Sequence, residues 1–179
     1  YAEAKLLRIL EPSPQRIAPR CKHFGVCGGC HWQFLSYPDQ LKIKEQQVHE
    51  TLARLGNLTA FPIQPIIPAP DPWYYRNKIE LSFGHTAEGQ VNFGFRERGK
   101  FHEIIPIESC HIFDDKLPSV LDVIRRYVRM SDLEPFDFVR KPDGFWQFLI
   151  LRRGVRTGEW MINFVTRPGH SIHKHLAEE

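Results

Sequence analysis

The sequence has few cysteines and methionines, no long hydrophobic run and no large excess of charge of either sign. No apolar stretch approaches the roughly 20 residues of a membrane-spanning helix, so we expect neither a membrane span nor a signal peptide. Four cysteines in 179 residues are too few for a disulfide scaffold, which predicts a reducing, cytoplasmic setting. The net charge of +3 permits nucleic acid as a partner without requiring it.

Both ends of the sequence suggest a piece of a longer protein. Residues 1–10 begin without Met and read as the last strand of a preceding small β-domain, and residues 11–14 follow as a linker. Residues 169–179 end the sequence where a helix would begin. We therefore expect one central domain over residues 15–168, flanked by remnants of two neighbours.

A first helix is predicted over residues 37–56. Ser36 or Tyr37 can cap it, Pro38 falls in its first turn, and Gly56 can end it. Its apolar stripe is either buried core or a face that packs on a domain outside this sequence. The stripe comprises Leu41, Val48, Leu52 and Leu55.

The remainder predicts an α+β fold with a mainly antiparallel sheet and a second helix over residues 117–130. Strands are predicted over segments 76–83, 91–95, 101–107, 136–140, 144–153 and 159–166, and segment 76–83 alternates between apolar and polar residues with a period of two. Strands and helices do not alternate as βαβ units, which favours antiparallel pairing. In segment 144–153 we expect one buried face, formed by Trp146, Phe148 and Ile150.

The cysteines carry the strongest chemical signal. Cys21, Cys27 and Cys30 form the pattern C-x5-C-x2-C, and Cys110 stands alone far downstream. Three thiolates on one loop with a fourth from a distance predict a tetrahedral centre, either Zn²⁺ or an iron–sulfur cluster. Zinc sites usually take their ligands as two compact pairs, whereas this three-plus-one arrangement is common for clusters. Free thiols are the third alternative.

The residues around the cysteines fit such a centre. Gly28 and Gly29 would let the loop wrap tightly, because glycine tolerates positive φ, and would bring N–H donors near the sulfurs. Aromatic side chains would exclude water, namely Phe24, Trp32 and Phe34. Four thiolates complete a site, so we expect the flanking histidines to be packing or hydrogen-bonding neighbours. They are His23, His31 and His111.

Several motifs occur in the order found in one family. They are Cys21-x5-Cys27-Gly-Gly-Cys30-His-x-Gln33, Tyr37-x-x-Gln40-Leu-x-x-Lys44, Tyr75-Arg76-Asn77-Lys78, Gly94-Phe-Arg96-x-Arg98-Gly and Ile107-x-x-Cys110. In these motifs the sequence resembles the RNA uracil-C5 methyltransferases of tRNA and ribosomal RNA, in particular the members that carry a [4Fe–4S] cluster.

The resemblance implies a parent protein in three parts. A small β-barrel, the TRAM domain, would end with the strand over residues 1–10. A central domain would hold the cluster on Cys21, Cys27, Cys30 and Cys110, and a Rossmann-like domain would bind S-adenosylmethionine. In the family, a cysteine adds to C6 of uracil, C5 takes the methyl group and a base removes the C5 proton.

This sequence departs from the catalytic part of that pattern. It contains no glycine-rich loop for S-adenosylmethionine, and all four cysteines are assigned to the metal. We therefore expect no catalytic residue here and no activity from this piece alone. Methyl transfer to uracil C5 requires no electron, so we expect the cluster to have a structural role.

Basic residues gather in two of the predicted hairpins. The first group is expected to contact RNA phosphates and comprises Arg76, Lys78, Arg96, Arg98 and Lys100. The second group is a weaker candidate and comprises Arg152, Arg153 and Arg156. Acidic residues lie nearby in the sequence, so the alternative is that these charges only solvate the surface.

The sequence thus predicts the cluster-binding, RNA-recognising region of an S-adenosylmethionine-dependent RNA uracil-C5 methyltransferase. The main alternative is a non-enzymatic RNA-binding module stapled by zinc or a cluster. An electron-transfer protein is a third, less favoured class. A dimer through the apolar face of the first helix is a further alternative.

Overall fold

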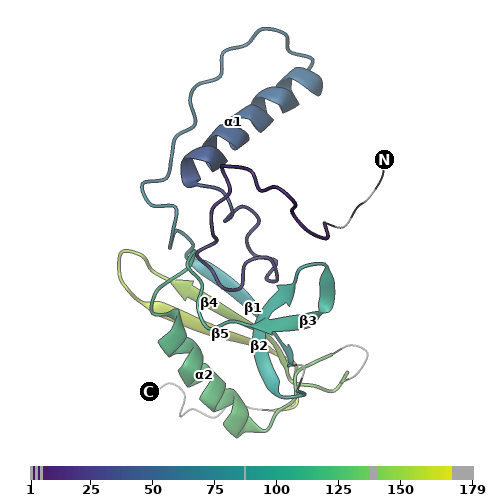
Figure 1. Cartoon of the computed structure of the whole chain (residues 1–179). Coiled ribbons are helices and arrows are strands. Elements are labelled where there is room, and N and C mark those ends of the chain that lie inside the picture. Colours follow the sequence, from purple (N-terminus) through teal and green to yellow (C-terminus); the bar gives the residue numbers. More distant parts are fainter. Residues whose placement is uncertain (1, 3, 5, 87, 138–140, 171–179) are drawn as a thin grey trace. The chain divides into compact units, whose positions relative to one another are not determined.

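The computed structural model describes residues 2, 4, 6–86, 88–137 and 141–170 (Figure 1). The chain divides into two compact units. The first unit comprises residues 1–20 and 32–70, and the second comprises residues 21–31 and 71–179. All four cysteines therefore belong to the second unit.

The first unit contains the helix α1, Tyr37–Arg54. The hydroxyl of Ser36 accepts a hydrogen bond from the Asp39 N–H at 3.3 Å, and Pro38 lies in the first turn. The helix is capped at Leu55, and Asn57 follows with a left-handed φ of 55°. The predicted helix and its start are confirmed, and they follow from capping chemistry.

The apolar stripe of α1 is not a buried core, because α1 contains no buried residue. Val48 and Leu55 are 52% and 84% exposed. A shallow groove of about 470 Å³ runs along this face, lined by Lys44, Gln47, Val48, Thr51, Leu52 and Ile66. The interpretation of the stripe as core is therefore wrong for this chain, and a dimer through this face stays a prediction.

The second unit is built on a five-stranded antiparallel sheet with strand order β3-β2-β1-β4-β5 (Figure 1). The strands are β1 Lys78–His85, β2 Val91–Glu97, β3 Lys100–Pro106, β4 Trp146–Arg153 and β5 Trp160–Thr166. The helix α2, Leu117–Ser131, packs on one face of the sheet through Leu117, Leu121, Ile124 and Val128. The predicted α+β class and antiparallel pairing are confirmed.

Strand β4 corrects the expected burial pattern. A register shift between Trp146 and Phe148, where β4 pairs with β5, inserts an extra residue. Such a bulge moves the following side chains to the opposite face of the sheet. As a result Trp146, Leu149 and Leu151 are buried in the core, while Phe148 and Ile150 are only half-buried.

Three expected elements are not seen in the described residues. Residues 2, 4 and 6–10 form no strand, so the last strand of a small β-barrel is not observed, and residues 1, 3 and 5 lie outside the description. Pro135 and Asp137 make only isolated bridges, and residues 138–140 are not described. The helix expected over residues 169–179 lies largely outside the described residues.

Among the helices that the structure describes, none has the length and the apolar composition that a bilayer crossing requires.

Candidate metal centre

The cysteine loop, residues 21–31, is folded by two overlapping turns. The carbonyl of Cys21 accepts from the Phe24 N–H at 3.0 Å, and the carbonyl of His23 accepts from the Cys27 N–H at 2.9 Å. Between them Gly25 has a φ of 92°, a backbone region that side-chain-bearing residues rarely adopt. The two turns bring Cys27 back towards Cys21.

The loop docks on the β2–β3 hairpin through its backbone. The Arg98 N–H donates to the Val26 carbonyl at 2.8 Å, and the Gly28 N–H donates to the Arg96 carbonyl at 3.3 Å. Cys27 and Glu97 form an antiparallel bridge between these two bonds. The loop thus pairs with the last residues of β2, beyond Gly94, where the pairing of β2 with β1 ends.

A second contact joins the loop to the segment before Cys110. The Lys22 ammonium forms an ion pair with Glu108, and the Glu108 N–H lies 3.5 Å from His23 Nε2. Burial and the nearby Lys22 charge lower the pKa of His23, which favours the neutral ring that this contact requires. The loop therefore reaches both the hairpin and the segment that carries the fourth cysteine.

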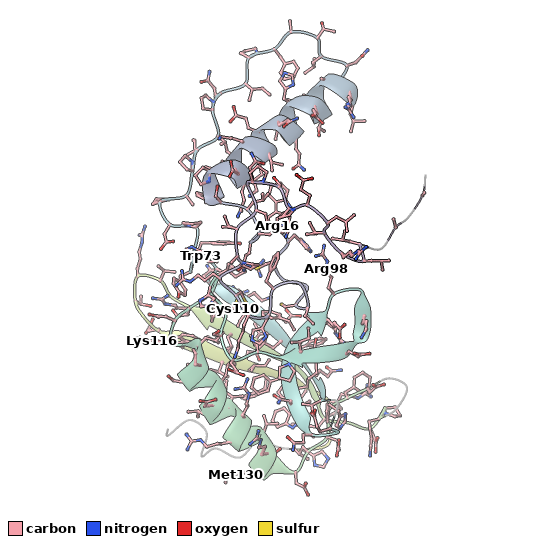
Figure 2. All side chains as sticks on the ribbon, viewed as in Figure 1. Arg16, Trp73, Arg98, Cys110, Lys116 and Met130 are labelled. Carbon is pink, nitrogen blue, oxygen red and sulfur yellow. The ribbon has the colours of Figure 1, made fainter. Side chains whose placement is uncertain are left out.

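Cys110 lies in a tight turn between β3 and α2 (Figure 2). Its carbonyl accepts from the Phe113 N–H at 3.0 Å, and it forms an antiparallel bridge with Asp114. The segment before β1 flanks this turn, because the N–H groups of Tyr74 and Arg76 donate to the carbonyls of His111 and Ile112, each at 2.9 Å. Cys110 is only 9% exposed and belongs to the hydrophobic core, against which Cys30 also packs.

The four thiols are close enough to influence one another's ionisation. The pKa of Cys110 is raised to about 11, mainly by burial and secondarily by the charges of the other three thiols. Burial likewise raises the pKa of Cys27, with further contributions from Cys30 and Cys21. The charge of Arg76 opposes this rise at Cys27. These effects place the four thiols near one another, and their role as ligands of one centre stays a prediction.

Backbone N–H groups also donate hydrogen bonds to the sulfurs of Cys27 and Cys110. The Gly29 N–H lies 3.4 Å from Cys27 Sγ and favours its thiolate. The Ile112 N–H does the same for Cys110, so in both segments the donor lies two residues after the cysteine. The expected donors near the sulfurs are therefore present. The expected positive φ at Gly28 and Gly29 is wrong, because the loop instead places it at Gly25.

The four thiols do not converge on one point. Among the described residues, no group of three or more His, Cys, Asp or Glu side chains is arranged to hold a single metal ion.

The flanking histidines have other contacts. His23 faces the Glu108 backbone, and His111 Nδ1 lies 3.5 Å from the Tyr74 hydroxyl while its ring meets Trp73 edge-on. His31 is exposed. Of the expected aromatic neighbours, Phe24 is half-buried in the loop itself, whereas Trp32 and Phe34 belong to the first unit.

The basic residues expected to contact RNA have different surroundings. Lys78 pairs with Glu80 at 3.1 Å, and Lys100 pairs with Glu97 at 3.0 Å and with Glu103 at 3.1 Å. These carboxylates offset the charges of both lysines. Arg96 and Arg98 are exposed at the hairpin that carries the loop, while Arg76 is half-buried near Cys27.

The second basic group does not form a surface cluster. Arg153 instead pairs with the buried carboxylate of Asp114, and only Arg152 and Arg156 are exposed. Neither Asp114 nor Arg153 was identified from the sequence as part of the site. The available signal was the position of Asp114, four residues after Cys110 and just before a helix.

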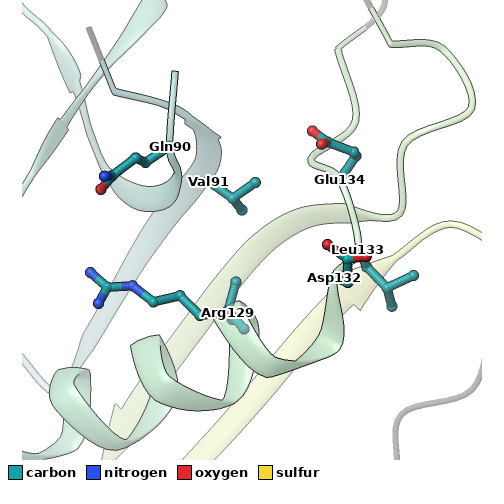
Figure 3. A pocket seen from close by; sticks show the side chains of 7 residues that line it. Gln90, Val91, Arg129, Asp132, Leu133 and Glu134 are labelled. Carbon is teal, nitrogen blue, oxygen red and sulfur yellow. The ribbon is translucent and has the colours of Figure 1, made fainter. Parts of the chain in front are cut away.

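A separate cavity of about 300 Å³ lies at the C-terminal end of α2. Figure 3 shows Gln90 and Arg129 on one side of it and Asp132, Leu133 and Glu134 on the other. None of the four cysteines lines this cavity, and its rim is exposed and of mixed charge. We assign no function to it.

No family model matches this chain. Nearly its whole length is nevertheless similar in sequence to part of several known proteins. An uncharacterized RNA methyltransferase from Synechocystis sp. is 36% identical over 178 residues, which are 99% of this chain and 37% of the relative. Another from Caldanaerobacter subterraneus is 35% identical over 165 residues, which are 92% of this chain and 36% of the relative. The chain is homologous to RNA methyltransferases. It spans a little over a third of the length of these relatives.

A solved structure supports the same homology. The tRNA (uracil-54, C5)-methyltransferase of Pyrococcus abyssi, in complex with S-adenosyl-L-homocysteine, matches with a TM-score of 0.68 and 26% sequence identity. The match covers 91% of this chain and 35% of that chain. The resemblance that the ordered motifs predicted is thereby confirmed.

Proposed function

We propose that this chain is the cluster-binding and RNA-recognising part of an S-adenosylmethionine-dependent RNA uracil-C5 methyltransferase. The observation that carries the proposal is that Cys30 of the loop packs against the core cluster that contains Cys110, while Cys21 and Cys27 share that loop. The RNA substrate and the methyl donor are supported by the names of the relatives and by the S-adenosyl-L-homocysteine in the structural neighbour.

The chemistry of the donor set fits a bound metal cluster. Burial raises the pKa of Cys27 and Cys110, so these two thiols favour the protonated form unless a cation compensates them. Metal binding removes these protons and supplies that compensation. The N–H groups that follow Cys27 and Cys110 by two residues are placed to stabilise the bound sulfurs.

The arrangement favours a cluster over zinc. A tetrahedral zinc ion with bonds of about 2.3 Å requires sulfurs roughly 3.8 Å apart. The described side chains are not gathered so closely around one point. A four-iron cluster is larger than one ion and does not require the four sulfurs to lie around a single atom. Three ligands from one loop and one from elsewhere is also a common cluster arrangement.

When bound, the cluster would supply a rigid cross-link between the loop and the Cys110 turn, since uracil-C5 methylation requires no electron. The chain's own residues then determine the surface that RNA meets. The loop is bonded to the backbone of Arg96 and Arg98, so fixing the loop also fixes this hairpin. Both guanidinium groups are exposed there and are placed to contact phosphates.

Chemical analysis of the anaerobically purified chain tests the cluster assignment. We expect about four irons and four sulfides per chain, with a broad absorption band near ~400 nm. One zinc, no sulfide and a colourless sample would contradict it and would favour a zinc-stapled RNA-binding module.

Binding to a uridine-containing RNA stem–loop tests the recognition role. Replacing Arg98 with Ala should weaken binding and reduce the slope of log K against log salt by about 0.7. Lys100→Ala is the matched control in the same turn, because Glu97 and Glu103 already offset that charge. Equal losses from both variants would show that the hairpin contributes only general charge.

A further inference from the structure

The buried carboxylate of Asp114, in the turn that carries Cys110, forms an ion pair with the partly exposed Arg153 of β4. We propose that Asp114 and Arg153 are positioning residues, which together hold Cys110 where the cluster needs it. This inference rests on the proposed cluster, because its importance comes from the ligand that the turn presents.

Asp114 closes the ligand turn on its C-terminal side. Its backbone bridges to Cys110, and it is only 1% exposed. Its Oδ1 accepts from the Lys116 N–H at 2.7 Å, and its carbonyl accepts from the Leu117 N–H at 3.4 Å. The carboxylate therefore ties the ligand turn to the first residues of α2.

Arg153 reaches the same carboxylate from the end of β4. Its Nη1 contacts Asp114 Oδ2 as an ion pair, although Oδ2 accepts no well-aligned hydrogen bond within the described part of the chain. The attraction is therefore one of charge more than of hydrogen-bond alignment. The Arg153 N–H also donates to the Asn77 carbonyl at 3.0 Å, which anchors the arginine backbone beside the start of β1.

The charge of Arg153 offsets the buried charge of Asp114. The Asp114 side chain is fully buried and Arg153 is 27% exposed, so the guanidinium can offset the carboxylate while it remains partly hydrated. A neutral residue in place of Asp114 or Arg153 leaves the remaining charged side chain without its ion-pair partner. The turn then loses its tie to β4, and the thiol of Cys110 is free to shift.

The entry to the turn is held differently. Arg125 of α2 donates to the Ile107 carbonyl and pairs with Asp122 at 3.2 Å. This contact fixes the chain three residues before Cys110, but it reaches only a neutral carbonyl. The charged contact lies on the other side, where Asp114 bridges directly to the ligand. We therefore place the positioning role on Asp114 and Arg153.

Cys110 is the single predicted ligand outside the loop, so the cluster has no alternative thiol from this side. A change in groups that orient ligands typically costs about 10–100-fold in metal affinity. Loop residues, by contrast, can adjust around a bound cluster because many of them are exposed.

The test measures iron release from the purified, cluster-loaded chain to a ferrous chelator. Asp114→Asn and Arg153→Met should each release iron about tenfold faster or more. They should also change the visible circular dichroism of the cluster, which reports ligand geometry. The matched control is Arg152→Met, the adjacent exposed residue of β4, which should stay within about twofold of the unmodified chain.

The double variant Asp114→Asn with Arg153→Met separates positioning from general stability. It removes both charges, so thermal stability should recover relative to the single variants. A positioning role predicts that iron release stays fast in this double variant, whereas a merely structural role predicts recovery of the original rate. If either single variant fails to fold, the double variant carries the test.

The outcomes also distinguish this inference from the proposed function. If the unmodified chain holds no iron and sulfide, the cluster proposal fails. If it holds the cluster and the single variants release iron at the unmodified rate with an unchanged dichroism spectrum, the positioning inference is overturned and the cluster stands.

Discussion

The two segments that supply the thiols are held in different ways. The loop, residues 21–31, contributes three cysteines and has exposed residues at Lys22, Gly25, Val26 and Gly28. Backbone hydrogen bonds and one exposed ion pair attach it to the rest of the second unit. The Cys110 turn contributes one cysteine, lies in the core and is tied to α2 and β4 by the buried carboxylate of Asp114.

This difference suggests that the two segments become ordered by different interactions. The turn is formed by folding of the sheet and α2, so its thiol is in place before any metal arrives. The loop has several exposed residues, so the proposed cluster would contribute much of its order. We expect perturbations of the core beneath the turn to act through global stability, and perturbations of the loop or of the Asp114–Arg153 pair to act through cluster retention.

The largest effect is expected from the core that supports the turn. Leu121 of α2 is fully buried, and Leu121→Ala should lower the free energy of unfolding by about 2–5 kcal/mol. Hydrogen exchange of the β1 and β4 amides, which report global opening, measures this loss. Val26→Ala, in the loop and 49% exposed, is the control and should change it by less than about 0.5 kcal/mol. Similar losses from both variants would remove the distinction between the segments.

Removal of the cluster should affect the loop far more than the turn. We expect the amides of Cys27 and Gly28 to lose at least about 30-fold of their hydrogen-exchange protection after anaerobic chelation. The amide of Phe113, in the Cys110 turn, should keep its protection because the core holds that turn. Uniform loss across both segments would mean that the cluster maintains the whole unit.

Backbone strain in the loop should speed up cluster loss. Gly25→Ala places a side chain at a φ of 92°, which costs on the order of 1–2 kcal/mol and should accelerate iron release roughly 5–30-fold. Gly29→Ala is the matched control, because Gly29 has no positive φ and an added Cβ would meet only Cys27 Sγ at 3.4 Å. The account requires the Gly25 variant to be the more severe of the two.

The smallest effect is expected from the exposed ion pair between Lys22 and Glu108. Both side chains are more than half exposed, so Lys22→Ala should increase iron release only slightly at low salt. The difference should vanish at high salt, where the Debye length shrinks to about 3 Å at 1 M. A large, salt-independent effect would show that Lys22 acts on the loop in another way.

Much of the fold could be predicted because its signals are local. Ser36 and Pro38 mark the start of α1, and the alternation in β1 and β2 marks their strands. The burial of β4 could not be predicted in the same way. Its bulge depends on how β4 pairs with β5, which a period-two pattern within one strand does not contain.

At the candidate site, too, features that are local in sequence could be predicted, whereas contacts that depend on the tertiary fold could not. The spacing of Cys21, Cys27 and Cys30, with the isolated Cys110, predicts a four-cysteine site, and that site stays a prediction. The partner of Asp114 could not be found from sequence, because Arg153 lies on a strand 39 residues further along the chain. An amphipathic stripe predicted α1, but only packing could show that this stripe is exposed.

The most direct test of the central claim is native mass spectrometry of the anaerobically purified chain and of its Cys110→Ser variant. The account predicts that the unmodified chain carries an added mass of ~352 Da, four irons with four sulfides, and that most of the variant has lost it. An added mass of ~65 Da, one zinc, would contradict the cluster. A variant that keeps the full cluster would contradict the role of Cys110 as its fourth ligand.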